Sequence, residues 1–211
     1  MHDATKTTLS DLLESENKPT LRERLGVGMD TIPLEHPLVA NSTDELIPFE
    51  ETPTLTPPRV GDYWPGQGGY YAGIIRDGDR QWHLISASHR TAFYSGASWG
   101  AMGLACNDAS SARDGMRNTY AILKADPTNR IASHFCALLI EGHKDFYWPS
   151  QCENNLIFIN LPDRRVQRCH WSSTQSSAYT AWYQHFGEGH QTIQEKHHDF
   201  CARAVRRILI D

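Results

Sequence analysis

Six prolines between Asp30 and Arg59 restrict what this chain can fold into more than any other feature of its sequence. Proline fixes φ and lacks the N–H that helices and sheets use, so this stretch predicts an extended segment. The first 60 residues carry 11 acidic and 5 basic side chains, whereas residues 61–211 carry 14 and 15, so the net charges are −6 and +1. We therefore expect an N-terminal arm over residues 1–60 and one folded domain over residues 61–211.

The arm contains two short helical patterns before the prolines begin. Residues Ser10 to Leu13 form the first, and Thr20-Leu21-Arg22-Glu23 is a capping-box signature that predicts the start of the second. The lack of an apolar stripe leaves the arm little to bury by itself. Both a disordered linker and an arm that lies along a partner or a neighbouring subunit agree with this composition.

Composition excludes several functional classes. Neither part has the basic excess of a protein that binds nucleic acid. No apolar run approaches the roughly 18 residues that a membrane helix needs, so we expect no insertion into a membrane. The N-terminus lacks the basic and apolar regions of a secretory signal, which predicts folding in a cytoplasm. The five cysteines include no CxxC pair, which favours free, buried thiols over zinc ligands or a disulfide framework.

The pattern changes at Gly61, after which regular segments and turns follow one another. Two β-prone segments, 70–76 and 81–85, flank the turn signal Asp77-Gly78-Asp79 and predict a hairpin. Gly, Ser and aromatic residues dominate residues 86–106, which predicts a long ordered loop. The remaining predictions are helices at 110–123 and 131–139, an element beginning at Pro149, and strands at 170–174, 179–186 and 202–210.

Seven short motifs occur in a characteristic order along residues 61–211. They are Gly69-Tyr70-Tyr71-Ala72-Gly73, Asp114-Gly115-Met116-Arg117-Asn118-Thr119, Tyr147-Trp148-Pro149-Ser150, Trp171-Ser172-Ser173-Thr174, Ala181-Trp182 with Phe186, Lys196, and Arg203-Ala204-Val205-Arg206. In this order they resemble the Lcl C-terminal-like domain of bacterial surface adhesins and bacteriophage proteins. That family is similar to the C-type-lectin-like and formylglycine-generating-enzyme folds. The resemblance implies an α+β fold with a small twisted antiparallel sheet, two helices and long loops, preceded here by the extended arm.

The resemblance also implies a function in binding. Phage receptor-binding proteins and retroelement-diversified variable proteins look similar at this level and display variable side chains on a rigid scaffold. Together with the lack of a signal peptide, this predicts a non-enzymatic virion protein of a phage tail, baseplate or fibre that binds a host-surface glycan or protein. Residues 1–60 would dock the domain to other virion proteins, in a homo-oligomer for which the resemblance to tail fibres suggests a trimer.

Two other functions remain open. In the first, the protein is a purely structural virion component whose lectin-like domain contacts other subunits. In the second, it is an enzyme that cleaves cell-wall glycans, which needs two carboxylates at a fixed separation. The acidic residues of residues 61–211 are scattered and no pair stands out, so binding without catalysis is the favoured prediction.

One catalytic pattern occurs in the sequence. Gly96-Ala97-Ser98-Trp99-Gly100 matches the Gly-x-Ser-x-Gly elbow of hydrolases, which lies between a parallel strand and a helix. No alternating strand and helix pattern surrounds it, so an ordered loop is the favoured interpretation. The tripeptides with which similar lectins bind calcium are absent, and Cys201 lacks the partner that formylglycine-generating enzymes require. We expect no catalytic residue, no metal and no cofactor.

Histidines near the C-terminus raise the alternative of a metal site. They are His185, His190, His197 and His198, the last followed by Asp199. Adjacent side chains on a strand point to opposite faces, so His197 and His198 would not share one ion. A solvated turn is therefore the favoured interpretation.

Aromatic side chains are the positive signal for binding. On the strand at 179–186, alternation places Trp182 and Phe186 on a core face and Tyr183 and His185 on the outer face, with an ordinary half-exposed strand as the alternative. Rigid rings lose little entropy on binding and stack on sugars or protein surfaces. In a second candidate surface, residues 92–103, the rings could instead pin the loop to the core. The predicted ligand-binding residues are Tyr179, Tyr183, His185, His190, Tyr94 and Trp99.

Three arginines lie in the last predicted strand, Arg203, Arg206 and Arg207. We expect them to pair with carboxylates such as Asp145 or Glu153. A site for an anionic ligand is the alternative for this group.

Overall fold

The predicted hairpin and the last strand of the chain form the first of two sheets in a computed structural model that describes residues 55–210. Its strands are β1 (Tyr63–Trp64), β2 (Gly69–Asp77), β3 (Arg80–Ala87) and β9 (Val205–Ile210). They pair in the order β1-β2-β3-β9, and every pair is antiparallel. The hairpin prediction is confirmed, and the first and last strands of the described region belong to one sheet, at its opposite edges.

Two glycines allow this hairpin to form. Gly78 has φ +60° in the turn between β2 and β3, a conformation that favours glycine. At Gly69 a Cβ would lie 2.1 Å from the carbonyl oxygen of Ser86, so β2 approaches β3 closely only because the side chain is absent.

The second sheet has five strands and mixed pairing. They are β4 (Phe93–Ala97), β5 (Cys169–Gln175), β6 (Thr180–His185), β7 (Gln191–Glu195) and β8 (Phe200–Arg203). Their order is β4-β8-β5-β6-β7, in which the β5–β8 pair is parallel and the other pairs are antiparallel. The strands predicted at 170–174 and 179–186 are therefore confirmed.

Two predictions from the sequence differ from this arrangement. The predicted loop at 86–106 contains the 3-10 turn η2 (Arg90–Ala92) and strand β4. The predicted closing strand at 202–210 divides at Ala204 between the two sheets, because the buried Ala204 donates its N–H to the carbonyl of Ala92 at 2.8 Å instead of continuing a ladder.

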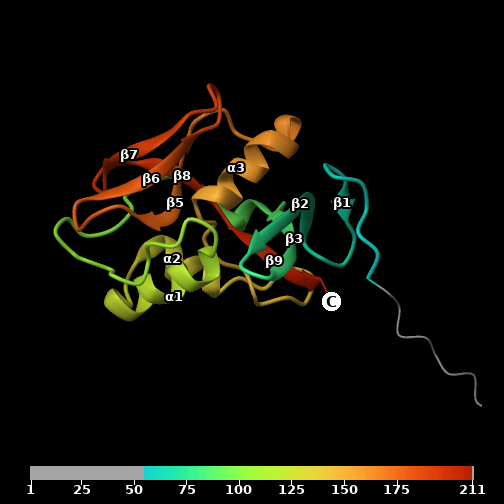
Figure 1. Ribbon diagram of the computed structural model, residues 1–211, viewed down its shortest axis with the longest axis horizontal. Helices are drawn as coiled ribbons and strands as arrows, with labels where there is room; N and C mark the ends of the chain where they lie inside the picture. Colours follow the sequence, from blue (N-terminus) through green and yellow to red (C-terminus); the bar gives the residue numbers. More distant parts are fainter. Residues whose placement is uncertain (1–54, 211) are drawn as a thin grey trace, which may run out of the picture. The chain divides into compact units, whose positions relative to one another are not determined.

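Three helices and one 3-10 turn pack against the sheets, where the resemblance implied two helices. They are α1 (Gly115–Ala125), α2 (Arg130–Cys136), α3 (Gln151–Asn160) and η3 (Pro162–Arg164). Side chains of Asp114, Asn129 and Ser150 accept hydrogen bonds from the first turns of α1, α2 and α3. Figure 1 shows α1 and α2 beneath the second sheet, with α3 between that sheet and the β2–β3 hairpin. The fold class is α+β, as predicted.

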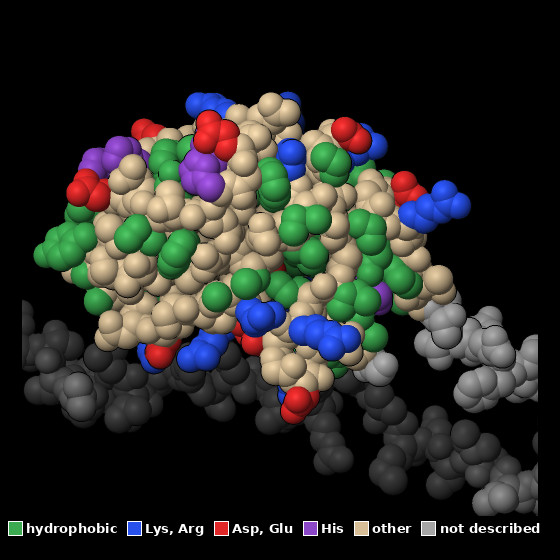
Figure 2. All heavy atoms as spheres, turned by 45° about the horizontal axis from the view of Figure 1, so that its top comes forward, with side chains coloured by type: hydrophobic (Ala, Val, Ile, Leu, Met, Phe, Trp, Pro, Cys, Tyr) green, Lys and Arg blue, Asp and Glu red, His purple; other side chains and the backbone are tan. Residues whose placement is uncertain are grey.

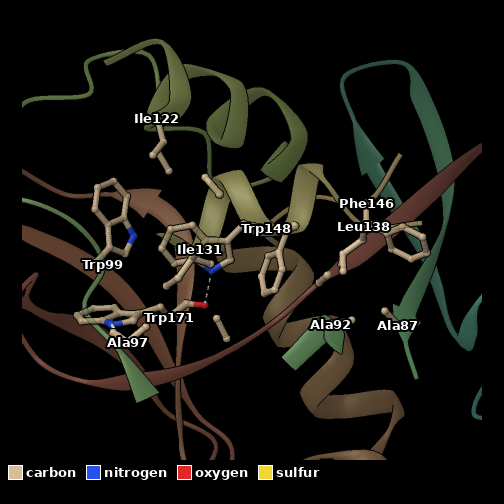
Figure 3. Packing of buried hydrophobic residues seen from close by; sticks show 14 of the residues in the cluster. Ala87, Ala92, Ala97, Trp99, Ile122, Ile131, Leu138, Phe146, Trp148 and Trp171 are labelled. Carbon is tan, nitrogen blue, oxygen red and sulfur yellow. Dashed lines mark hydrogen bonds between the residues drawn. The ribbon is translucent and has the colours of Figure 1, made fainter. Parts of the chain in front are cut away.

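A core rich in tryptophan holds α1, α2 and the second sheet together (Figure 3). The indole N–H of Trp148 donates to the carbonyl of Trp171 at 3.0 Å, and the rings of Trp99 and Trp148 lie 5.5 Å apart. All three side chains are buried, and their N–H groups all have acceptors.

The cysteines agree with the prediction of free thiols. All five lie within the described region and none is paired, with Cys106 and Cys201 buried and the other three half-buried. Burial raises the pKa of all five thiols, so they are poor nucleophiles and metal ligands at neutral pH. Among the helices of residues 55–210, none is long and apolar enough to cross a bilayer.

Candidate functional site

Six ring side chains form a continuous line along the second sheet, and we call this line the ring strip. Successive ring centroids are separated by 5.1, 6.2, 4.8, 6.0 and 4.5 Å. In order, the ring strip consists of His185, His190, Tyr183, Phe200, His198 and His197.

A buried indole supports the middle of the ring strip. Trp171 pairs with Tyr183 across β5 and β6, and its ring lies 6.2 Å from that of Tyr183 and 4.6 Å from that of Phe200. Its N–H donates to the carbonyls of Ala97 and His198, which fixes the indole. Tyr183 and Phe200 therefore rest on an immobile surface, which lowers the entropy lost when a ligand binds them.

The β6–β7 hairpin positions the histidines at one end of the ring strip. Gly189 has φ +89°, and a Cβ there would lie 2.7 Å from the ring of Phe158, so the turn requires glycine. The N–H of Gly189 donates to the carbonyl of His185 at 2.8 Å. As a result the rings of His185 and His190 stack with an angle of 16° between their planes.

A buried lysine positions the histidines at the other end. The Nζ of Lys196 donates to the carbonyl of Leu104 at 2.7 Å and to Oε1 of Gln175 at 2.8 Å, and it lies 4.4 Å from the centre of the Trp99 ring. Burial lowers the pKa of Lys196, although these contacts compensate its charge. Because Lys196 anchors the start of the turn after β7, this turn holds His197 and His198 at the surface.

This turn confirms the favoured interpretation of the segment as a turn and corrects only the argument from strand alternation. His197 and His198 lie in a turn and not on a strand, so the alternation of strand side chains does not apply to them. Their rings stack at 4.5 Å instead of pointing to opposite faces.

The exposure of the rings differs along the ring strip. Its centre, with Tyr183 and Phe200, is half-buried, while His190 and His197 are exposed. Acidic groups lie at both ends, since Glu188 is 3.3 Å from His190 and Glu195 is 3.3 Å from His197. Figure 2 shows histidines beside acidic side chains at two places on the face drawn. Burial raises the pKa of Tyr183, so its phenol stays protonated at neutral pH and can donate a hydrogen bond.

Within residues 55–210, two groups of side chains could hold a metal ion, one at each end of the ring strip. They are His185 with Glu188 and His190, and Glu195 with His197 and His198, each with its ligand atoms within 4.8 Å of one another. A tetrahedral zinc ion with bonds of about 2.1 Å requires separations of about 3.4 Å between ligand atoms. In each group one histidine nitrogen already lies 3.3 Å from a glutamate oxygen.

The first group is committed to another interaction. Nδ1 of His185 accepts a hydrogen bond from the N–H of Glu188 at 2.9 Å, so a neutral ring carries its proton on Nε2 and has no free lone pair. Metal binding there would break a hydrogen bond of the hairpin turn.

Three of the six predicted ligand-binding residues, Tyr183, His185 and His190, come together in the ring strip. Tyr179 is 58% exposed at the opposite end of β6, where its ring covers Gly103. Tyr94 is half-buried against α2, with its hydroxyl donating to the carbonyl of Arg130 at 3.1 Å. The predicted residues therefore do not form a single surface.

Two tryptophans differ from their predicted roles. Trp99 is 1% exposed and its N–H donates to the carbonyl of Ser172 at 2.7 Å, so it pins the loop to the core and offers no face to a ligand. Trp182, predicted to be in the core, is only half-buried. Its cross-strand neighbour Ile193, on the edge strand β7, is itself 44% exposed, which leaves this position incompletely covered.

The Gly-x-Ser-x-Gly segment has the context of a loop. Strand β4 ends at Ala97, pairs antiparallel with β8, and is followed by irregular chain until α1. The strand–turn–helix geometry that exposes a hydrolase serine is absent at Ser98.

Sequence reasoning missed Phe200 and the stacking of His197 and His198 as parts of the ring strip. The sequence placed His185 and His190 among the ligand-binding residues, whereas His197 and His198 entered only as candidates for a metal site. Comparison of the chain with models of known protein families and with curated proteins finds no match.

Proposed function

We propose that this protein is a non-enzymatic recognition protein of a bacteriophage virion, in which a lectin-like domain binds a host-surface glycan or protein through the ring strip. The observation that carries the proposal is the continuous line of six partly exposed rings on an immobile support. Rings in this setting stack on sugar faces or apolar protein surfaces at low entropic cost.

The positions of the resemblance motifs support a lectin-like scaffold. Ser172 donates to the carbonyl of Trp182 at 2.8 Å, and Thr174 donates to the carbonyl of Ser111 at 2.9 Å. Together with the buried Lys196, these motif residues tie the long connections to the second sheet. Because these motif residues hold the fold, the side chains of the ring strip can differ without loss of the scaffold, as a display scaffold requires.

Co-sedimentation of the full chain with isolated cell envelopes from a panel of bacteria tests the binding proposal. We expect binding to some envelopes without release of soluble sugar, because the proposed function is recognition and not cleavage. The double variant Tyr183→Ala, His190→Ala should lose most of this binding while its thermal unfolding stays cooperative. Tyr120→Ala is the matched control, since Tyr120 is a 59% exposed tyrosine on α1, outside the ring strip.

Two results would overturn the proposal. Release of soluble sugar from the envelopes would identify an enzyme. Unchanged envelope binding by the double variant would place the recognition surface elsewhere on the molecule.

A hollow between β2 and α3 favours the alternative of a structural virion component. It has a volume of about 390 Å³ and includes Ile74 and Ile159, which are 47% and 61% exposed. Exposed apolar side chains around a hollow are typical of subunit contacts. In that case Ile159→Lys should change the oligomeric state measured by light scattering, and the double variant of the ring strip should not.

The docking role proposed for the arm falls on residues outside the described region, except for residues 55–60. Deletion of residues 1–51 tests it, because a docking arm is needed for assembly and not for the fold of the domain. We expect light scattering to show loss of oligomerisation, with cooperative unfolding and envelope binding retained. Equal assembly of the full and truncated chains would identify the arm as a passive linker.

A further inference from the structure

A small cavity between α3, η3, β3 and the second sheet collects positive charge. Its polar lining comprises Arg164, Arg165 and Arg203 with Ser86, Asn154 and His170. The last three side chains form a buried floor, with exposed fractions of 3% each, whereas Arg164 is exposed and lies at the mouth. We call this space the arginine cavity.

No carboxylate balances these arginines within residues 55–210. The lining contains no acidic side chain, and none of the three guanidinium groups is within ion-pair distance of a described carboxylate. The neighbouring arginines of β9 behave differently, since Arg206 pairs with Asp145 at 2.9 Å and Arg207 pairs with Asp114 at 3.0 Å. The prediction that all three C-terminal arginines pair with carboxylates therefore fails at Arg203.

The hydrogen-bonding capacity of the arginines is also incompletely used. Arg203 donates to the carbonyl of Ala87 at 2.8 Å and stacks over the ring of Phe93. Arg165 donates to the carbonyl of Phe158 and stacks over that ring, but its Nε is buried without a partner. A guanidinium carries five N–H donors, and a buried donor without an acceptor destabilises the folded state.

The buried His170 in the floor of the cavity is neutral at physiological pH. Burial, together with the positive charges of the neighbouring Arg203 and Arg168, lowers the pKa of His170 to about 3. His170 is therefore neutral at physiological pH and adds no positive charge. The charge at the cavity comes from the arginines alone.

We propose that the arginine cavity binds one small monovalent anion of the halide class, with chloride as the physiological ligand. About 10 Å³ is open to the centre of a water-sized sphere, which is room for roughly one such particle. A monatomic anion fits this space better than an oxyanion and accepts hydrogen bonds from several directions. A water molecule of similar size would leave the positive charge uncompensated.

The bound anion would join separate parts of the chain. Arg164 and Arg165 belong to the segment at η3, whereas Arg203 ends β8 in the second sheet. An anion between them replaces a missing carboxylate and fastens this segment to the sheet. Because it binds the folded state only, it stabilises the protein in a saturable manner.

Thermal unfolding of the full chain in increasing sodium chloride tests the proposal, with sodium gluconate added to keep the ionic strength constant. Gluconate is too large for the cavity, so a change in Tm as chloride replaces it reports binding of chloride. We expect the Tm to rise with chloride and to saturate in the millimolar range. Arg165→Met and, independently, Arg164→Met should abolish the saturable rise. Arg117→Met, an exposed arginine on α1, is the control and should retain it.

The Arg164 side chain is exposed, so Arg164→Met should fold even if Arg165→Met does not. The Arg164 variant therefore keeps the test decisive. A Tm that does not depend on chloride, or an identical saturable rise in Arg164→Met, would overturn the proposal. Anomalous diffraction from crystals grown in sodium bromide gives a second readout. An anomalous bromide peak between Arg165 and Arg203 is expected. The absence of this peak would refute an anion at this position.

Discussion

Two regions of the molecule place their acidic groups differently. At the junction of α1 and α3 the carboxylate of Glu153 is buried, whereas in the ring strip the carboxylates are exposed. Glu153 is fully buried, and Tyr147, Ser150 and Gly115 all donate to its carboxylate, at 2.6, 2.6 and 3.2 Å. In the ring strip, Glu188 and Glu195 are exposed, and each has one histidine at 3.3 Å.

The comparison separates scaffold from surface. A buried carboxylate with three donors has one geometry and resists change, and a Cβ at Gly115 would already lie 2.4 Å from its Oε2. Exposed pairs cost little to rearrange, so the side chains near them can adapt to a ligand. The predictions below test whether this contrast holds, from the largest expected effect to the smallest.

Trp171→Ala is expected to have the largest effect on stability. Removing a fully buried indole typically costs about 3–5 kcal/mol through lost burial and the cavity that remains. Trp182→Ala should cost clearly less because Trp182 is half-buried. Urea unfolding of the two variants checks the order. Equal losses would mean that Trp182 is as well packed as Trp171.

Glu153→Gln sharpens the contrast between the two acidic environments. The Gln oxygen can accept from the two backbone N–H groups that now donate to Oε2, but its amide nitrogen then replaces Oε1, which accepts from the hydroxyl of Tyr147. Loss of this buried hydrogen bond to a charged group costs about 1–3 kcal/mol. Glu188→Gln, at an exposed position, should change the free energy of unfolding by less than about 0.5 kcal/mol. Chemical denaturation measures both, and similar values for the pair would contradict the comparison.

The pH dependence of stability should reveal His170. Its ring has a pKa of about 3 in the folded state and near 6.5 in the unfolded chain, so only the unfolded chain gains the proton between these values. Stability is therefore highest above pH 6.5 and falls toward pH 3, by up to about 1.4 kcal/mol per pH unit. His170→Gln should remove this contribution, which the difference between the two pH profiles measures. Parallel profiles would exclude it.

Metal removal should have the smallest effect. In the first histidine group Nδ1 of His185 already accepts a hydrogen bond that a metal ion would have to break, and the favoured interpretation of the second group is a solvated turn. Dialysis of the full chain against EDTA should leave the Tm unchanged within error. A fall in Tm that zinc reverses, and that His197→Ala and His198→Ala prevent, would show that the second group holds a metal.

Local patterns in the sequence predicted the elements more reliably than the site. Alternation and the Asp77-Gly78-Asp79 turn predicted the β2–β3 hairpin, because both signals act within a few residues. The same alternation assigned Trp182 to the core, although burial there depends on the edge strand β7. The alternation that selected Tyr183 could not show that its ring lies 4.8 Å from the ring of Phe200, which is 17 residues away in sequence.

The sequence by itself determined the change in composition at Gly61, the α+β class and the free cysteines. Tertiary structure decided that Trp99 and Lys196 are buried together, that residues 202–210 divide between two sheets, and that Arg203 lacks a carboxylate. The reason is the range of the interactions. Turns and alternation depend on neighbouring residues, whereas burial, ring contacts and charge pairing depend on which distant segments the packed core brings together.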